Sequence, residues 1–333
     1  MQNYPKRAKL LLLLKYFESE TDEQSPKTME QILSHLQNFN ITAERKSIYA
    51  DMTLLRDMDY DIIKSSKDGE VAYYLNESLF EQAEAEIFAS AVCAAKFVTQ
   101  KKSSELLDKI SNLFSERQAK VFRQRIELAR TQKTNNVEVY YNIDKIVNAM
   151  NSNKKISFLY FEYLPDKTQR VKKEGARYFA TPYTQMWFED AYYLICNIDK
   201  YDNLSHFRID RMTKIEVLDE PARDIDEVSE YKNYLDFDEY HKSIFSMFGG
   251  QTKTVRIRFA QSLATAVFDR FGLDVPVSEI KEGWFTISTK VRVSPGFLSW
   301  ITLFGDQIEV LSPNTLRNEI KEMLSKLNQV YNN

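Results

Sequence analysis

Glycine, proline, cysteine and histidine are all scarce in this sequence of 333 residues. With only 8 glycines and 8 prolines, a long disordered segment is not expected. The two cysteines, Cys93 and Cys196, lie far apart, which excludes a zinc site built from cysteine pairs and fits a reducing cytosol. The three histidines, His35, His206 and His241, are too few to favour a catalytic metal. We therefore expect a cytoplasmic protein without a metal or cofactor.

Long hydrophobic runs and a large excess of one charge are also missing. The run Leu10–Leu14 is five residues long, whereas a membrane-spanning helix needs about 20 apolar residues, so no membrane segment is expected. The formal net charge of -3 excludes a protein that coats nucleic acid through bulk charge, but it permits a small local basic face. The length predicts two or three domains, and a hydrophobic content of 43% is enough for several cores.

Familiar catalytic motifs are absent from the sequence. It contains no GxSxG, HExxH, GxxxxGK[ST] or GxGxxG pattern. These absences argue against a hydrolase, a zinc enzyme or a nucleotide-driven motor, and we expect no enzymatic activity. An enzyme acting on nucleotides through scattered carboxylates would leave no such motif, so it stays open as a second alternative.

The first 76 residues have the apolar spacing of three short helices followed by a β-hairpin. Thr28 and Gln31 can form a capping box at the start of the second helix. The third helix is expected over about 42–58, and two β-like runs joined by Asp68 and Gly69 predict a hairpin. The apolar residues expected to line the helix faces are Leu10, Leu13, Leu14 and Phe17, then Met29, Ile32, Leu33 and Leu36, then Ile48, Met52 and Leu55.

Polar and basic side chains are predicted on the outer face of the third helix. These candidate DNA-binding residues are Arg45, Lys46, Ser47, Tyr49 and Thr53. Such side chains reach phosphates and base edges from a helix in the major groove, and these cluster in the N-terminal half, where a recognition helix meets the bases. Residues 1–76 are therefore expected to form a winged helix-turn-helix that binds double-stranded DNA.

The charge balance of this region leaves an alternative open. Up to Leu75 it holds ten Lys and Arg residues against twelve Asp and Glu residues. The acidic residues lie largely at 18–23 and after Asp57, away from the expected reading face. Three short helices with a basic patch also occur in proteins that do not bind DNA. The alternative is a nucleic-acid or nucleotide sensor, or an interaction protein, whose helix-turn-helix does not read duplex DNA.

Residues 77–136 are expected to form a helical connector. The stretch from Ser78 to Arg130 has no proline or glycine, and Ile87, Ala91 and Ala94 share one helix face. The polar break 131–136 is a sensible domain boundary. The connector could couple the first domain to the rest of the chain and contribute to a dimer interface, but a plain structural connector fits equally well.

The remainder of the chain reads as two further domains, 137–220 and 221–333. Five short strands within some seventy residues of the first predict a small barrel, and the second has the order βαββαβ, which indicates a ferredoxin-like fold. Arg256 and Arg258 alternate with apolar residues on its first strand, and whether they join a ligand groove is left open. The expected barrel strands are 156–163, 177–183, 190–198, 205–209 and 212–218, and the later elements are strand 255–259, helix 262–271, strands 275–280 and 284–293, helix 295–304, strand 307–311 and helix 314–330.

Several stretches resemble families of bacterial regulators. Residues 46–55 are similar to the recognition helix of DeoR-like repressors, with Ala50 where that family usually has arginine and Asp59 in place of the usual glycine before the strand. Residues 192–194, Tyr-Tyr-Leu, resemble the Trp-Tyr-Leu signature of the WYL family. Residues 207–211, Phe-Arg-Ile-Asp-Arg, resemble its F-R-L-D-R motif. Together with the preceding helix-turn-helix, the resemblance covers nearly the whole chain.

The resemblance implies an Sm-like or SH3-like barrel with a basic, aromatic groove that senses nucleic-acid fragments or nucleotide-like effectors. Guanidinium groups grip phosphate in a bidentate manner, and aromatic faces stack on bases. The candidate ligand-binding residues are Tyr160, Arg177, Tyr193, His206, Arg208 and Arg211. Asp210 could instead serve as an ion-pair partner for an arginine, and Leu194 is expected in the core.

These observations together predict an α+β multidomain regulator. Its parts are a winged helix-turn-helix, a helical connector, a small Sm-like or SH3-like barrel and a ferredoxin-like C-terminal domain. The resemblance implies dimer contacts through that last domain, and we expect a homodimer that binds a DNA operator at half-sites about one helical turn apart. An effector in the arginine groove would then bias the placement of the two DNA-binding heads.

Overall fold

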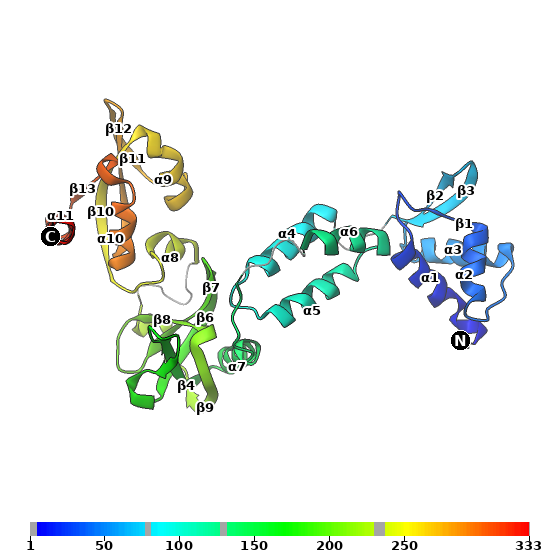
Figure 1. Ribbon diagram of the computed structural model, residues 1–333, viewed down its shortest axis with the longest axis horizontal. Helices are drawn as coiled ribbons and strands as arrows, with labels where there is room; N and C mark the ends of the chain where they lie inside the picture. The colour runs from blue at the N-terminus through cyan, green and yellow to red at the C-terminus, as the bar shows by residue number, and fades with distance from the viewer. Residues whose placement is uncertain (1–4, 77–80, 127–131, 230–236, 333) are drawn as a thin grey trace. The chain divides into compact units, whose positions relative to one another are not determined.

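The computed structural model describes residues 5–76, 81–126, 132–229 and 237–332. The chain divides into two units, 1–137 and 138–333, and over the described ranges it is a mixed α/β protein with three antiparallel sheets (Figure 1). The two ends of the expected helical connector, 77–80 and 127–131, lie outside the described residues. No helix within the described ranges is long and apolar enough to span a membrane.

The first unit begins with three helices and a small sheet around one core. The elements are η1 (Lys6–Ala8), α1 (Lys9–Glu20), β1 (Lys27–Thr28), α2 (Met29–Gln37), α3 (Arg45–Asp57), β2 (Ile62–Lys67) and β3 (Glu70–Leu75), and the sheet order is β1-β3-β2. The capping box is confirmed, because Thr28 accepts from the Gln31 backbone and the Gln31 side chain accepts from the Thr28 backbone. Asp68 (φ 51°) and Gly69 (φ 85°) form the hairpin turn, where both central residues have positive φ.

The same core shows why the apolar spacing of these helices matters. Leu13, Phe17, Ile32, Ile48 and Met52 are almost completely buried, as the spacing predicts. Each helix therefore turns one apolar face inward and leaves its opposite face for solvent.

Three more helices follow in the first unit: α4 (Gln82–Ala94), α5 (Gln100–Ser111) and α6 (Glu116–Ile126). Their core contains Ala85, Ala89 and Cys93 from α4, packed with Leu107 and Phe114. The face of α4 that carries Ile87, Ala91 and Ala94 points away from this core, since Ile87 is 68% exposed. Small residues therefore make the close helix–helix contact, and the larger isoleucine lies outside.

A buried carboxylate joins the first helices to the later ones within this unit. Asp22 accepts hydrogen bonds from Ser115 Oγ (2.6 Å) and from Arg117 Nε (3.1 Å to Oδ2). Burial alone would raise the pKa of Asp22, but the hydrogen bonds from Ser115 and Arg117 outweigh it and lower that pKa. Ser115 immediately precedes α6, so the contact fixes the start of α6 against the end of α1.

The second unit begins with a helix and six strands. The elements are α7 (Val139–Asn151), β4 (Lys154–Tyr163), β5 (Gln169–Val171), η2 (Lys173–Gly175), β6 (Tyr178–Phe188), β7 (Ala191–Ile198), β8 (Leu204–Arg208), η3 (Ile209–Arg211), β9 (Met212–Pro221) and η4 (Ile225–Glu227). The sheet has the order β5-β4-β6-β7-β8, and β9 pairs with β4 on its other side. The single turn η3 thus connects the two strands at opposite ends of the path β9-β4-β6-β7-β8. Helix α7 and strand β5 were not predicted from the sequence.

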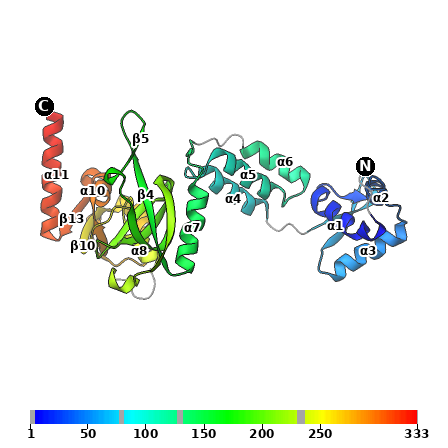
Figure 2. The same cartoon turned by 90° about the horizontal axis from the view of Figure 1, so that it is seen from below.

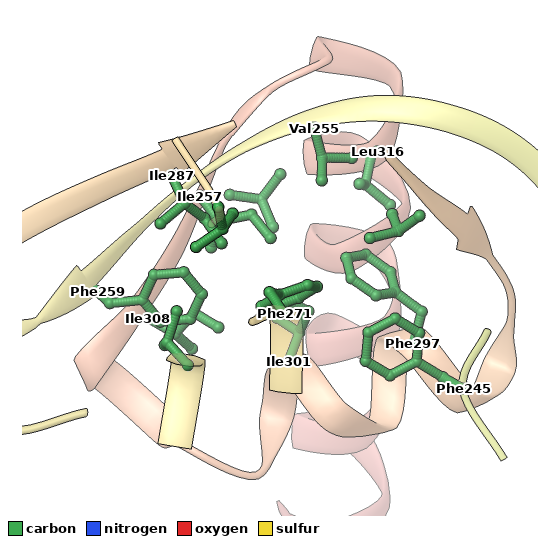
Figure 3. Packing of buried hydrophobic residues seen from close by; sticks show 14 of the residues in the cluster. Phe245, Val255, Ile257, Phe259, Phe271, Ile287, Phe297, Ile301, Ile308 and Leu316 are labelled. Carbon is green, nitrogen blue, oxygen red and sulfur yellow. The ribbon is translucent and has the colours of Figure 1, made fainter. Parts of the chain in front are cut away.

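The C-terminal part has the order β-α-β-β-α-β that the sequence predicts. Its elements are α8 (Phe237–Ser243), β10 (Gln251–Ala260), η5 (Gln261–Leu263), α9 (Ala264–Phe271), β11 (Val277–Lys281), β12 (Trp284–Val293), α10 (Pro295–Thr302), η6 (Gly305–Gln307), β13 (Ile308–Ser312) and α11 (Asn314–Asn332). The sheet order is β11-β12-β10-β13. Figure 3 shows its core, in which Val255, Ile257 and Phe259 of β10 face Phe271 of α9 and Phe297 of α10. Figure 2 shows α11 beside β13.

Candidate nucleic-acid interface and effector site

The outer face of α3 carries the candidate DNA-binding residues. Arg45, Lys46 and Thr53 are exposed, and Tyr49 is 44% exposed. The opposite face of the same helix is anchored by the buried stripe Ile48, Met52 and Leu55, so the exposed side chains are presented from a fixed backbone. This arrangement suits a helix that enters a groove of duplex DNA.

Ser47 is held differently from the other four candidates. It is half-buried, and its hydroxyl accepts a hydrogen bond from Lys9 of α1. The same Lys9 ammonium pairs with Asp51 at 2.7 Å. Ser47 therefore helps to dock α1 on α3, and Arg45, Lys46, Tyr49 and Thr53 form the more accessible set.

Two departures from the repressor-like pattern have structural consequences. Ala50 is exposed on α3, so it leaves an open position among the basic residues. Asp59 has φ 69°, in the left-handed region that favours glycine. A residue with a side chain pays a conformational cost there, although aspartate tolerates it better than most.

A second cluster of candidates lies on β7, β8 and η3. Tyr193 of β7 stands directly opposite Arg208 of β8 in the sheet register. His206 lies two residues before Arg208 on β8, so alternation places both side chains on the same face as Tyr193. Leu194, with the opposite orientation to Tyr193, is fully buried, as the alternation predicts.

Arg208 is clamped by a carboxylate. Its Nε donates to Asp210 Oδ1 at 3.0 Å and its second guanidinium nitrogen donates to Oδ2 at 2.9 Å. Hydrogen bonding to Asp210 raises the pKa of Arg208 further above its usual range. The clamp fixes the orientation of the guanidinium group, and its remaining N–H donors stay available because arginine carries five.

Arg211 and Tyr160 lie beside this pair. The Tyr160 hydroxyl accepts a hydrogen bond from the Arg208 backbone nitrogen at 3.3 Å, and burial is the main cause of its raised pKa. The charge of Arg211 acts on both Tyr160 and Tyr193. Arg211 Nε is buried and has no hydrogen-bond partner among the described residues. A buried guanidinium donor without a partner is costly, and an anionic ligand would satisfy it.

His206 contacts a residue from the next segment of the chain. Its Nε2 lies 2.5 Å from the hydroxyl of Tyr240 in α8, and the ring of Tyr240 lies under the guanidinium of Arg292 at 5.2 Å. Burial and the charge of Arg292 lower the pKa of His206 to about 4. His206 is therefore neutral at pH 7 and acts as a hydrogen-bonding group.

Arg177 does not join this cluster. It donates to the Ser157 hydroxyl (3.0 Å) and the Lys214 carbonyl (2.6 Å) and pairs with Glu216 (3.2 Å). All of these partners lie on β4 and β9, and within the described ranges none of its contacts reaches β7 or β8. The position of Arg177 indicates a structural tie between strands.

Two family models match the second unit. Residues 141–217 match the WYL domain, and residues 251–327 match the WCX domain. The chain carries a WYL domain followed by a WCX domain. None of the curated proteins matches the chain.

A solved structure similar to this chain is proteasome accessory factor B/C (PafBC) of Arthrobacter aurescens. The alignment has 13% sequence identity and a TM-score of 0.31, and it covers 96% of this chain but 47% of that one. The chain therefore spans about half the length of that protein, and a TM-score this low supports no inference about fold or function.

The WYL domain contains five of the six ligand-binding candidates in one neighbourhood, and two further residues complete their surroundings. Tyr240 lies just after the WYL domain, and Arg292 belongs to the WCX domain. The sequence pattern could have indicated Arg292. Lys290 and Arg292 alternate with valines on strand 284–293, as Arg256 and Arg258 alternate with apolar residues on strand 251–260. Nothing in the local sequence indicates that Tyr240 reaches His206.

Arg256 and Arg258 of the WCX domain lie away from the His206–Tyr240 contact. Arg256 pairs with Glu279 at 2.8 Å, and Arg258 pairs with Glu309. Both side chains are close to half exposed.

The described residues contain no group of three His, Cys, Asp or Glu side chains that could hold a metal ion.

Proposed function

We propose that this protein is a DNA-binding transcriptional regulator whose WYL domain senses a nucleic-acid-fragment or nucleotide-like effector. The observation that carries the proposal is the division of α3 into two faces. Ile48, Met52 and Leu55 anchor the helix, while Arg45 and Lys46 stand exposed at its N-terminal end. The presence of a WYL domain in the same chain supports a regulatory role.

In this proposal residues 1–76 are a winged helix-turn-helix. Helix α3 enters the major groove, where Arg45, Lys46, Tyr49 and Thr53 meet phosphates and base edges, and Ser47 supports them through its contact with Lys9. The β2–β3 hairpin is the wing. Its exposed Lys64 lies on the second strand of this small sheet and adds a cation for the DNA backbone.

The effector site is the surface around Arg208 and Arg211. The five-strand path β9-β4-β6-β7-β8, closed by the turn η3, supports an Sm-like or SH3-like barrel, and the βαββαβ order of the WCX domain supports a ferredoxin-like fold. Arg208, oriented by Asp210, and Arg211, with its unpaired Nε, would hold phosphate. Tyr193 would stack on a base, and neutral His206 would accept or donate one hydrogen bond.

In this proposal the protein acts as a cytoplasmic homodimer. Two α3 helices would read half-sites about one helical turn apart, and the helices of 77–136 would connect the heads to the sensing domains. The exposed α4 face around Ile87 is available for a contact between the two copies. Effector binding would alter operator binding through a difference in affinity for two arrangements of the heads.

An electrophoretic mobility shift with duplex DNA tests the proposal. Wild-type protein should bind duplex DNA at low salt, and Arg45→Ala/Lys46→Ala should lose sequence-selective binding. Lys101→Ala/Lys109→Ala on α5 is a matched control, because it removes two positive charges from exposed positions elsewhere in the same unit. Equal binding by wild type and the α3 variant would contradict the proposed reading face.

One observation favours a second candidate function. Ala50 leaves α3 without a basic side chain in the middle of its exposed face. The second candidate function is a protein that senses nucleic acid or nucleotides but does not read duplex DNA. Wild-type protein that binds no duplex even at low salt would support this second candidate.

A further inference from the structure

The β-sheet of the WCX domain has one face covered by helices and one face without them. Val255, Ile257 and Phe259 of β10 point toward α9 and α10 and are fully buried. The alternate residues of β10 therefore point to the other face. Of these, Thr254, Arg256 and Arg258 are exposed, so no other described segment of the second unit covers them.

Three exposed cations from the two central strands, Arg256, Arg258 and Lys290, occupy this open face, and the partly buried Arg292 lies at one end of it. The register places Thr254 opposite Lys290 and Arg256 opposite Ser288, so even-numbered residues of both strands share the face. The row begins on β12 with Arg292 and then Lys290, against the direction of the chain. Arg256 and then Arg258 continue the row on the neighbouring strand β10. The row spans about 27 Å from residue 292 to residue 284 at about 3.4 Å per residue.

The acidic residues on this face leave the cations able to bind another anion. Glu279 pairs with Arg256, and Glu309 pairs with Arg258. The Arg256–Glu279 pair is exposed, and pairs of this kind are weak. Glu309 is half-buried and also pairs with Arg317 at 2.9 Å, so Arg258 shares its carboxylate with a second arginine. Lys290 is exposed and has no acidic partner in the part of the chain that the structure describes. Arg256 and Arg258 also keep further N–H donors.

One end of the row carries an aromatic ring, and the other end meets the proposed effector site. The Arg258 guanidinium lies 5.1 Å from the ring centre of Trp284. At the opposite end, Arg292 lies over Tyr240, which contacts His206 of the WYL domain. A cationic track with an aromatic platform is the arrangement that follows a single-stranded backbone.

We propose that the open face of the WCX sheet, defined by Arg256, Arg258, Lys290 and Trp284, binds the phosphate backbone of a single-stranded nucleic acid. The face is a second surface beyond the WYL cluster. Its connection to that cluster through Arg292 rests on the proposed effector site, but binding to the face itself does not. A mononucleotide is too short to occupy the row, so the surface selects for a strand of several nucleotides.

Fluorescence anisotropy with a labelled twelve-nucleotide oligo-dT tests the proposal. Binding is measured over a series of NaCl concentrations for wild type, for Arg256→Gln/Lys290→Gln and for the matched control Lys326→Gln/Lys321→Gln on exposed positions of α11. The sheet variant should bind at least about fivefold more weakly at 0.1 M salt, and its log–log salt slope should fall by about 1.4, or about 0.7 per lost phosphate contact. The control should match wild type.

Glu279→Gln provides a test in the opposite direction. It removes a competing negative charge and keeps an amide oxygen for the Thr286 hydroxyl, which donates to Glu279 at 3.2 Å. It should tighten oligo-dT binding, a gain that a purely structural role for the Arg256–Glu279 pair would not produce. Unchanged affinity in both sheet variants, or no oligo-dT binding by wild type, would overturn the proposal.

Arg208→Ala/Arg211→Ala separates this surface from the effector site. If that variant alone loses oligo-dT while Arg256→Gln/Lys290→Gln binds normally, the sheet proposal fails and the effector site stands. If only Arg256→Gln/Lys290→Gln loses affinity, the sheet proposal holds and the effector proposal fails for this ligand. Weakening by both variants supports one continuous binding surface.

Discussion

Single polar contacts connect distant segments of this chain. His206 and Tyr240 lie 34 residues apart, and Asp22 and Ser115 lie 93 residues apart. Each contact buries a group that water would otherwise solvate, so each is stabilising only while its partner is present. The pKa values of His206 and Asp22 are both shifted by their surroundings, so each contact can be followed by measuring the pKa of its titratable group.

His206 should make the second unit less stable in mild acid. Burial and Arg292 lower its pKa to about 4, from 6.5 when it is unfolded. Between those values the unfolded chain binds the extra proton, so stability falls as the pH drops from 6.5 toward 4. The full shift corresponds to about 3 kcal/mol. Denaturant unfolding at pH 7 and pH 4.5 should show this loss in wild type and much less of it in His206→Gln.

An NMR titration of His206 supplies the control. In Arg292→Met the pKa of His206 should rise, because one of the two causes of its depression is removed. A wild-type pKa near 6.5 would contradict the buried contact with Tyr240.

Asp22 should contribute stability at neutral pH and lose it in acid. Its pKa is lowered, so its contribution is present above its unfolded pKa and disappears as the pH falls through the folded value. Asp22→Asn should cost about 1–3 kcal/mol at pH 7, because hydrogen bonds to a charged group are lost. Its cost should shrink as the pH is lowered through the folded pKa of Asp22, because the wild-type carboxylate is then protonated. A cost that is independent of pH, measured by thermal unfolding, would argue against the Arg117 pairing.

At the scale of the element, α3 combines a structural face with a functional face. Met52 is 1% exposed, whereas Tyr49 is 44% exposed one turn earlier. Met52→Ala should destabilise the first unit by about 2–5 kcal/mol through loss of buried volume. Tyr49→Ala should change stability by less than about 1 kcal/mol and weaken duplex binding. Denaturant unfolding and DNA binding of the same two variants measure both effects.

The pair of variants also identifies a wrong assignment. If Tyr49→Ala destabilises the first unit by more than about 1 kcal/mol but the folded variant keeps its DNA affinity, the contact of Tyr49 with Tyr73 at 6.2 Å is structural and Tyr49 has no role in binding.

Elements with a strong local signal could be predicted from the sequence. The capping box at Thr28, the turn at Asp68 and Gly69 and the final βαββαβ order all depend on residues close together in the chain. The ion pair between Arg208 and Asp210 is equally local, because the two residues lie two positions apart. Local spacing is enough to favour each of these features.

Features that depend on tertiary contact were not predicted. Strand β5 has only three residues and forms by pairing with β4, so it has no pattern of its own. Tyr240 reaches His206, and Arg292 reaches Tyr240, only after the WYL and WCX domains have folded. Arg177 has the right chemistry for a ligand, but its partners on β4 and β9 come from later pairing of strands.

At the scale of the whole molecule, the proposed function requires two binding sites that affect one another. If an oligonucleotide in the WYL site alters operator affinity by some factor, operator DNA must alter oligonucleotide affinity by the same factor. We expect a coupling of about 5–150-fold, the range usual for such linkage. Titrating oligo-dT with and without operator duplex, and the reverse, measures both factors. An apparent affinity that keeps falling as the second ligand is raised, without reaching a plateau, would show that the two ligands compete for one site.

The central claim is that α3 reads duplex DNA, and selection from a randomised duplex library tests it most directly. Wild-type protein should enrich a sequence with two related half-sites about 10 base pairs apart. Arg45→Ala/Lys46→Ala should enrich none, while the α5 variant Lys101→Ala/Lys109→Ala should enrich the same sequence as wild type. A wild-type selection that yields no preferred sequence, or an α3 variant that enriches the wild-type sequence, would contradict the account.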